Sequence, residues 1–213
     1  MNGKKGGHTT LMPRNIERDL ELRRERCEQI LTAALELFAK NGLADTKISD
    51  IAKKAKMSHS LVYNYFHSKE EIYITILERN LCRLKLLVEH AKSQPIDAYG
   101  QLALIAEPFQ TGQWNDAIFH QLFIDQFFHS DSVGQELKDS VKGKINENIQ
   151  LIASIFVEGQ EKRLFVREDP QQLAFLFLSF IHSIVIAASR GLTLFEKPFD
   201  KQMLKLFLLR NEE

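Results

Sequence analysis

The stretch that most limits what this chain can fold into is residues 48–69, where two short helical patterns follow each other across a tight turn. The apolar residues of the first pattern, from Ile48 to Ala55, fall at helical spacing and form one face. Ser58 can cap a second helix, because its hydroxyl can accept a hydrogen bond from a backbone N–H at the helix start. Ser68 and Glu71 match a capping box, which marks the start of a third helix. The stretch therefore predicts a helix-turn-helix motif followed directly by another helix.

A wider set of residues around this motif fixes residue types at many offsets at once. The set is Ala33-Ala34-Leu35-Glu36-Leu37-Phe38, Asn41-Gly42, Thr46, Asp50-Ile51-Ala52, Ala55, Ser58, Val62-Tyr63, Tyr65-Phe66 and Lys69-Glu70. With these residues, the segment from about 30 to 77 resembles the DNA-binding domain of the tetracycline-repressor (TetR) family of bacterial transcription regulators. The chain departs from the family pattern at Lys56, where a turn glycine is common, and at His59-Ser60, which replaces a frequent Lys-Gly pair.

The resemblance implies that the helix around residues 58–66 enters the major groove of double-stranded DNA. The candidate contacts, by position in the family motif, are Thr46, Lys47 and Ser49 near the backbone, Tyr63, Tyr65 and Lys69 at phosphates, and His59, Ser60 and Asn64 at base edges. The alternative for each polar residue is an exposed side chain without a partner, and for Tyr65 a place in the core. The resemblance also implies a ligand-responsive homodimer, most simply a repressor, on a pseudo-palindromic operator.

The charge distribution supports this reading, although the net charge of the whole chain is zero. Residues 1–92 carry 17 Lys and Arg against 12 Asp and Glu, and residues 93–213 carry 11 against 16. A basic part followed by an acidic part fits one DNA-facing domain and one domain that faces something else.

Helical patterns continue along the whole chain, and no β-strand pattern appears. After a flexible, Gly-rich tail at residues 1–13, we expect a helix from residue 14 that ends at Asn41-Gly42. A linking helix at 69–92 and further helices are expected at 96–109, 113–129, 133–160, 170–189 and 200–209. The prediction is an all-α fold of about nine helices. Its domains are the DNA-binding domain at 14–68 and a ligand-binding and dimerisation domain at 69–213.

Aromatic residues concentrate in the second domain, which holds 13 of the 15 Phe and the single Trp. They favour a small-molecule effector that is mainly apolar, or cationic given the acidic charge of this half. The candidate ligand-binding residues are Phe109, Trp114, Phe123, Phe127, Phe177, Phe180 and His182. The alternative for each aromatic residue is simple core packing.

The segment 173–188 is apolar almost all round and must be covered on more than one side. We expect the helices at 170–189 and 200–209 to form the interface of a homodimer. A membrane-attached helical protein is a rival interpretation, but the segment is short for a span and holds Ser179, His182 and Ser183. A second rival is a ligand-binding dimer that no longer binds specific DNA.

Motifs of enzymes, cofactors and metal sites are missing from the sequence. There is no Gly-rich phosphate loop, HExxH motif or CxxC pair, so we expect no enzyme, no cofactor and no metal. Cys27 and Cys82 do not form a disulfide framework, and no secretory signal follows Met1. We therefore expect a cytoplasmic protein without a membrane partner.

Overall fold

The computed structural model describes residues 16–109, 123–124, 126–131, 133–189, 192 and 201–209. Within these ranges the chain is all-α, which confirms the expected fold class, and its single bridge joins Phe165 and Leu208. The elements are α1 (Ile16–Asp45), α2 (Ile48–Lys54), α3 (His59–Tyr63), α4 (Lys69–Ser93), α5 (Ala98–Ala106), the 3-10 helix η1 (Glu107–Phe109), α7 (Gln135–Glu161), α8 (Pro170–Ser189) and the 3-10 helix η2 (Lys201–Phe207). The tail at 1–13 lies outside the described residues, as does most of the expected helix at 113–129.

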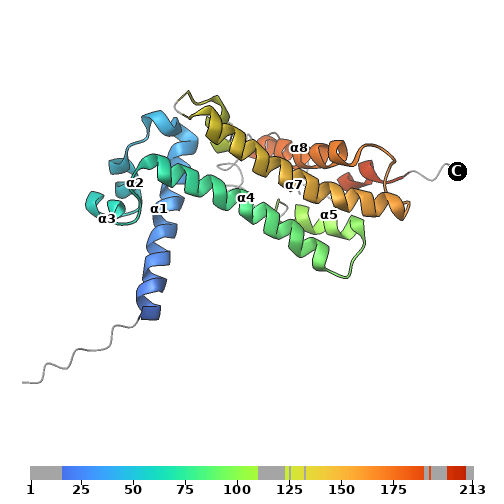
Figure 1. The fold of residues 1–213 in the computed structure, drawn as a ribbon, viewed down its shortest axis with the longest axis horizontal. Coiled ribbons are helices and arrows are strands. Elements are labelled where there is room, and N and C mark those ends of the chain that lie inside the picture. Colours follow the sequence, from blue (N-terminus) through green and yellow to red (C-terminus); the bar gives the residue numbers. More distant parts are fainter. Residues whose placement is uncertain are drawn as a thin grey trace, which may run out of the picture.

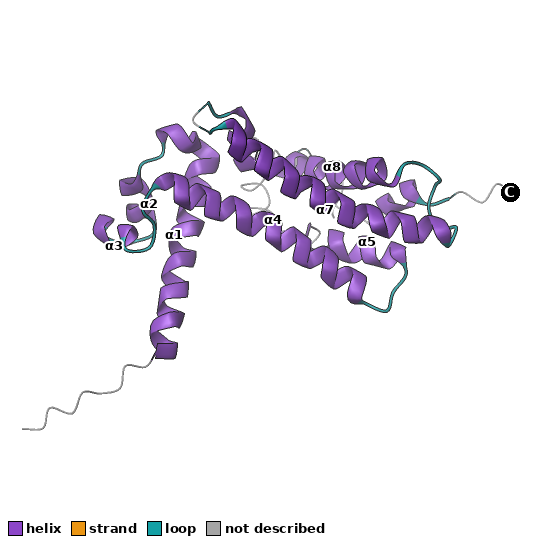
Figure 2. Ribbon diagram, in the orientation of Figure 1, coloured by secondary structure: helices purple, strands orange, loops and turns teal. Residues whose placement is uncertain are grey.

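The small helices α2 and α3 sit at one end of the molecule beside α1, while α4, α5, α7 and α8 form an elongated bundle (Figures 1 and 2). α4 belongs to both parts, because its first turns pack on α1 and its later turns pack on α5 and α7. The expected linking helix is therefore a continuous rod from the helix-turn-helix motif into the bundle.

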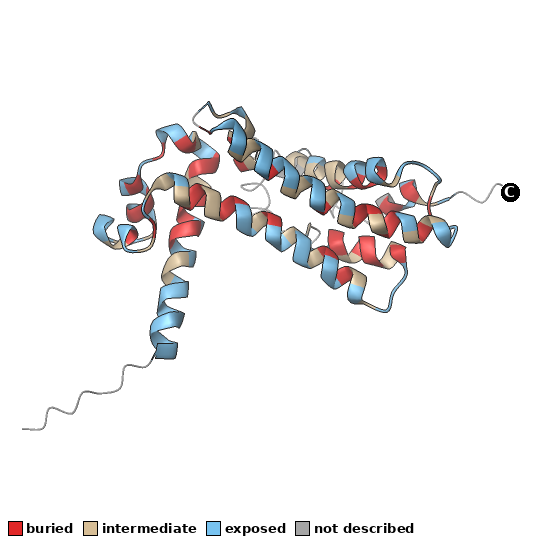
Figure 3. Cartoon of the chain, in the orientation of Figure 1, coloured by how far each residue is buried: buried red, intermediate tan, exposed pale blue. Residues whose placement is uncertain are grey.

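Two hydrophobic cores follow this arrangement, and Figure 3 shows the exposed first half of α1 beside them. The first core joins α1, α2, α3 and the start of α4 with Phe123, Phe127, Val133 and Val141. The second core lies among the later half of α4, α5, α7, α8 and η2. The helix-turn-helix motif therefore shares its core with residues far downstream in the sequence.

α1 breaks at the glycine where its end was expected. Gly42 has φ 78° and ψ 171°, which is the positive-φ conformation that glycine adopts without a Cβ clash. Helical turns resume and end at Asp45. The break turns the chain toward α2.

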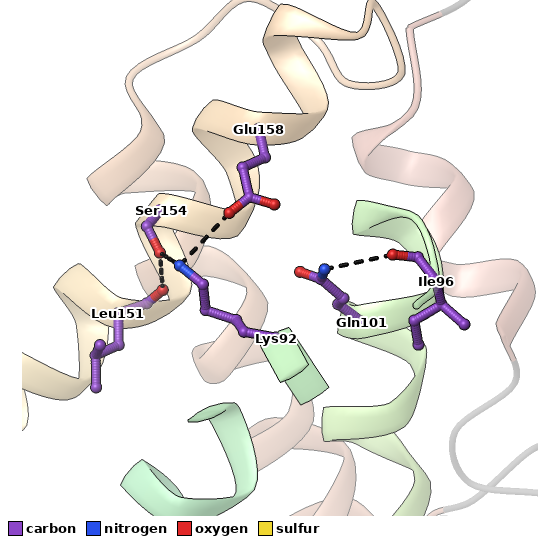
Figure 4. Close-up of polar contacts among 6 residues, drawn as sticks. All are labelled: Lys92, Ile96, Gln101, Leu151, Ser154 and Glu158. Carbon is purple, nitrogen blue, oxygen red and sulfur yellow. Dashed lines mark hydrogen bonds and ion pairs between the residues drawn. The ribbon is translucent and has the colours of Figure 1, made fainter. Parts of the chain in front are cut away.

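α7 runs alongside α4 in the same direction, as four polar contacts show. Lys144 Nζ lies 2.7 Å from Glu78 Oε1, and Asn148 Nδ2 donates to the backbone oxygen of Leu81 at 3.1 Å. Near the far end, Lys92 donates to Ser154 Oγ and lies 3.5 Å from Glu158 (Figure 4). The two helices are thus joined along most of their length.

Two expected helices differ from the structure. The helix expected at 96–109 ends at Ala106 and continues as η1, because Pro108 has no N–H to extend the helical hydrogen bonding. The segment expected as an α-helix at 200–209 is the 3-10 helix η2. Its end pairs with an extended segment, where Val166 N donates to Phe207 O at 3.0 Å and Leu209 N to Leu164 O at 2.9 Å.

Lys56 occupies the turn of the motif with φ 55°, a left-handed conformation that costs an L-residue about 1–2 kcal/mol. Lys56→Gly is expected to raise the free energy of unfolding by roughly 0.5–1 kcal/mol, the gain being reduced by the greater backbone freedom of unfolded glycine. Urea denaturation measures this change. The same substitution at the exposed neighbour Lys53, inside α2, is the control and is expected to destabilise the protein.

Candidate DNA-binding surface and ligand cavity

The start of α3 is fixed by its own side chains. Ser58 Oγ accepts a hydrogen bond from the N–H of Leu61 at 3.2 Å, as expected for an N-cap. Ser68 Oγ accepts from the N–H of Glu71 at 3.1 Å, and the Glu71 carboxylate accepts from the N–H of His67 at 2.6 Å. The starts of α3 and α4 are therefore both fixed by contacts between residues that are close in the sequence.

The outer face of α3 carries the residues expected to read base edges. His59, Ser60, Tyr63 and Asn64 are all exposed, while Val62 on the opposite face is fully buried in the first core. The rings of His59 and Tyr63 lie 5.0 Å apart in an edge-on arrangement. The helix thus presents polar and aromatic groups outward on a rigid base.

The other predicted DNA-binding residues lie in different surroundings. Lys47 and Ser49 are exposed at the start of α2. Thr46 is only 1% exposed, and its hydroxyl donates to the carbonyl of Gly42 at 2.7 Å. Tyr65 is half-buried with the Arg23 guanidinium 5.3 Å from its ring centre. Thr46 and Tyr65 therefore have structural contacts of their own.

Lys69 points back toward the end of α1. Its ammonium donates to the carbonyl oxygens of Leu43 at 2.7 Å, Ala44 at 2.9 Å and Thr46 at 3.2 Å. An ammonium has three N–H donors, so all three are engaged in this arrangement. Lys69 thus fastens the start of α4 to the segment between α1 and α2.

Lys69→Met is expected to lower the free energy of unfolding by about 1–3 kcal/mol, because three carbonyl groups lose a charged donor. Thermal or urea denaturation measures the loss. Lys47→Met is the matched comparison, since Lys47 is exposed. It should leave stability unchanged and lower the salt dependence of DNA binding by about one unit. A different result would contradict this role: if Lys69→Met left stability unchanged and lowered only the salt dependence of DNA binding, Lys69 would contact a DNA phosphate instead.

A cavity of about 460 Å³ lies inside the bundle among α4, η1, α7 and α8. Its lining residues are Asn80, Leu81, Arg83, Leu84, Leu87, Pro108, Phe109, Ile124, Ile145, Asn148, Ile149, Phe175, Leu178, Ser179, His182 and Val185. The volume is in the range of small-molecule sites. Most of the lining is apolar, with a few polar side chains from three helices.

Two of the predicted ligand-binding residues, Phe109 and His182, line this cavity. Phe123 and Phe127 are fully buried in the first core, and Phe177 is buried in the second core. Phe180 is half-buried and packs against the second core. Trp114 lies outside the described residues.

Sequence reasoning missed the polar lining residues of α4 and α7. Asn148 could have been identified from the sequence, because it interrupts an apolar stripe that includes Val141, Ile145 and Ile152 on the same helix face. Its amide donates to Leu81 O, so it also holds α7 against α4. Asn80 and Arg83 could not have been identified in this way, because polar residues are frequent along α4.

His182 is a half-buried ionisable side chain of the cavity lining. Burial lowers the pKa of His182 below its ordinary value of 6.5, because desolvation penalises the charged imidazolium. The ring is therefore neutral at pH 7, with one nitrogen that donates and one that accepts.

One short segment touches both the cavity and the DNA-binding part. Ile124 lines the cavity, while its neighbour Phe123 lies 4.1 Å from the Tyr73 ring centre. The Tyr73 hydroxyl donates to Phe123 O at 3.2 Å, and Gln126 Nε2 donates to Ala39 O at 3.0 Å. The segment therefore lies in direct contact with the cavity, with α1 and with the start of α4.

α8 leaves an apolar face uncovered within a single chain. Phe175 is 59% exposed and Leu176 54%, and Leu206 and Leu209 of the C-terminal segment are also exposed. The window 170–187 is long and apolar enough to cross a membrane by composition, with 28% of it buried. In the described ranges, no three His, Cys, Asp or Glu side chains are grouped to hold a metal ion.

Comparison with known proteins gives consistent relatives. The model of the family described as "Bacterial regulatory proteins, tetR family" matches residues 30–76. The fatty acid metabolism regulator protein of Bacillus subtilis is 29% identical over 143 residues, covering 66% of this chain and 71% of that protein. The HTH-type transcriptional regulator UidR of Escherichia coli is 29% identical over 136 residues, covering 57% of this chain and 69% of UidR.

Solved structures share the fold over most of the chain. A putative fatty acid metabolism regulator of Clostridium perfringens has a TM-score of 0.62 at 20% identity, covering 84% of this chain and 96% of that one. A putative transcriptional regulator of Saccharomonospora viridis in complex with choline has a TM-score of 0.68 at 21% identity, covering 90% and 100%. The helix-turn-helix geometry, the matched family model and these relatives agree. Residues 30–76 therefore carry the helix-turn-helix domain described for the tetR family of bacterial regulatory proteins, and the chain as a whole is similar to DNA-binding transcriptional regulators.

Proposed function

We propose that this protein is a cytoplasmic, homodimeric repressor that binds a pseudo-palindromic operator and leaves it when a small, mainly apolar molecule occupies the bundle cavity. The observation that carries the proposal is the exposed polar face of α3 on a motif joined by α4 to a 460 Å³ cavity. One continuous helix links a surface suited to DNA with a site suited to a ligand.

Direct reading of bases is assigned to His59, Ser60 and Asn64 on the outer face of α3. Asparagine can pair bidentately with adenine in the major groove. Tyr63, which is 44% exposed, and Lys47 and Ser49 at the start of α2 are assigned to the phosphate backbone. Thr46, Tyr65 and Lys69 hold the motif in shape through the contacts described above.

The homodimer is assigned to the uncovered apolar face of α8 together with the segment 201–209. Exposed Phe175, Leu176, Leu206 and Leu209 are costly to leave in water, and a second copy would bury them. A two-fold axis that runs along the bundle would place the two α3 helices on one side of the dimer. The half-sites of the operator are then one or more helical turns apart.

Release from DNA requires that the ligand bind the DNA-free arrangement of the dimer better than the DNA-bound one. The route is through α4 and through the Phe123–Ile124 segment, which touches the cavity wall and Tyr73. Relatives named as fatty acid metabolism regulators support an apolar ligand for this cavity.

Selection of bound sequences from random double-stranded DNA tests the operator proposal. An enriched palindrome is the expected result, and no enriched sequence would instead favour a ligand-binding dimer without specific DNA binding. With the enriched operator, Asn64→Ala is expected to lose discrimination at one base position, at a cost of about 1–3 kcal/mol. Asn146→Ala, an exposed residue of α7, is the control and should bind like wild type.

A further inference from the structure

The described lining of the cavity contains one charged side chain, Arg83, and no acidic residue. Arg83 forms no hydrogen bond or ion pair with any residue that the structure describes. Neighbouring cations on α4 behave differently. Arg79 pairs with Glu28, and Lys85 lies 4.0 Å from Glu89. Arg83 is exposed, so it lies at the rim of the cavity, where it also borders a smaller surface pocket beside Glu28. It brings a positive charge and five N–H donors to the cavity opening.

The neutral polar groups of the lining add further donors. Asn80 provides an amide, Ser179 a hydroxyl and His182 a neutral imidazole N–H. Asn148 contributes less, because its amide N–H already donates to Leu81 O. Donors and a positive charge suit a ligand group that accepts hydrogen bonds and is negatively charged.

Asn80, Arg83 and His182 lie nearer the helix-turn-helix end of the lining than Leu87 and Phe175, whereas Ser179 lies beside Leu178 toward the other end. Along α4, Asn80 and Arg83 come before Leu84 and Leu87 in the lining, on the side nearer the helix-turn-helix motif. α8 runs in the opposite direction to α7 and α4, since a short connection joins it to α7 and Phe177 packs on Phe156. His182 therefore lies toward the same end as Arg83, whereas Phe175 and Leu178 lie toward the other.

We propose that the effector is an amphiphile with an apolar chain and one anionic head group, a carboxylate or a phosphate, bound at Arg83. Asn80 and His182 complete the recognition of the head group, and the chain lies along Leu84, Leu87 and Leu178. The inference rests on the proposed function, because it names the ligand class of the same cavity. It replaces a cationic effector, for which the described lining offers no carboxylate.

Isothermal titration calorimetry of the full-length protein tests this ligand class with four probes of equal chain length. The probes are dodecanoate, dodecyl phosphate, dodecanol and dodecyltrimethylammonium. The expected order has at least one anionic probe binding about tenfold or more tighter than dodecanol, with the cation weakest. Whichever anion binds better distinguishes a carboxylate effector from a phosphate effector.

Arg83→Gln is expected to weaken the anionic probe about ten- to hundredfold and to leave dodecanol within about twofold. Arg83→Lys should restore part of the loss, because the charge returns without the planar guanidinium. Lys85→Gln is the matched control, since it removes one positive charge from the same helix outside the cavity lining. It should bind all four probes like wild type.

Three results would overturn the proposal: no binding of either anionic probe, tightest binding of the ammonium probe, or an equal loss of anion and alcohol binding in Arg83→Gln. Operator binding is measured for every variant without any probe. If operator binding is intact but neither anionic probe binds, the proposed ligand class is wrong and the proposed function as a DNA-binding regulator is retained. If wild type selects no operator, the proposed function fails by a separate result.

Discussion

Replacing Phe123 by alanine is expected to lower the free energy of unfolding by about 3–5 kcal/mol. Phe123 is fully buried, with ring centres at 4.1 Å from Tyr73 and 6.2 Å from Phe38. It comes from a segment near the cavity but fills the core under the helix-turn-helix motif. The truncation therefore leaves a void between the two parts of the chain. Urea denaturation followed by far-UV circular dichroism measures the loss.

Phe128→Ala is the matched control, because it is the same substitution in the same helical segment at a partly buried position. It should cost about 1 kcal/mol. An equal loss for the two variants would contradict the assignment of Phe123 to the shared core. Operator affinity of the Phe123→Ala protein should also fall, since Tyr73 and α1 lose the contact that positions them.

Gly159→Ala is expected to lower the free energy of unfolding, although a glycine-to-alanine substitution inside a helix usually raises it. Alanine normally stabilises a helix interior by about 1 kcal/mol relative to glycine. At Gly159 in α7, however, an added Cβ would lie 2.1 Å and 2.4 Å from the Cδ2 and Cε2 atoms of the Phe165 ring. Phe165 is only 1% exposed and cannot move without disturbing the second core. We expect a loss of about 1–3 kcal/mol or more in the free energy of unfolding.

Gly143 supplies the control on the same helix, because an added Cβ there meets no atom within 4 Å. Gly143→Ala should therefore stabilise the protein by about 0.5–1 kcal/mol. The double variant Gly159→Ala with Phe165→Leu should recover part of the loss, since the smaller side chain vacates the ring position. If Gly159→Ala and Gly143→Ala had the same sign, the close approach of α7 to Phe165 would not exist in solution.

The DNA-binding part could be predicted from sequence in detail because its signals are local. The caps at Ser58 and Ser68 and the positive φ of Gly42 depend on neighbours within a few residues. The end of the chain could not be predicted in the same way. η2 ends in backbone bonds to Leu164 and Val166, which are some forty residues away in the sequence. Backbone pairing of this kind does not produce a periodic pattern of side chains in the sequence, so it could not be predicted.

The cavity lining was the least predictable feature. Aromatic enrichment suggested Phe123, Phe127 and Phe177, but the first two rings pack on Tyr73 and the third packs on Phe156. Helical periodicity shows that a side chain faces inward, yet it does not separate a face toward a cavity from one toward a core. Arg83, on an otherwise amphipathic helix, could only be assigned once α8 and η1 were placed beside it.

The break of α1 at Gly42 is a meeting point for hydrogen bonds from several parts of the chain. A helix end leaves its last carbonyl groups without helical partners, and here several elements use that region. Gln126 binds the carbonyl of Ala39, Thr46 binds that of Gly42, and Lys69 binds those of Leu43, Ala44 and Thr46. The helix-turn-helix motif is therefore tied to α1, to the start of α4 and to the segment around Gln126 at this point. On the proposed mechanism, a shift of α4 near the cavity would therefore carry the helix-turn-helix motif with it and displace α3 on the DNA.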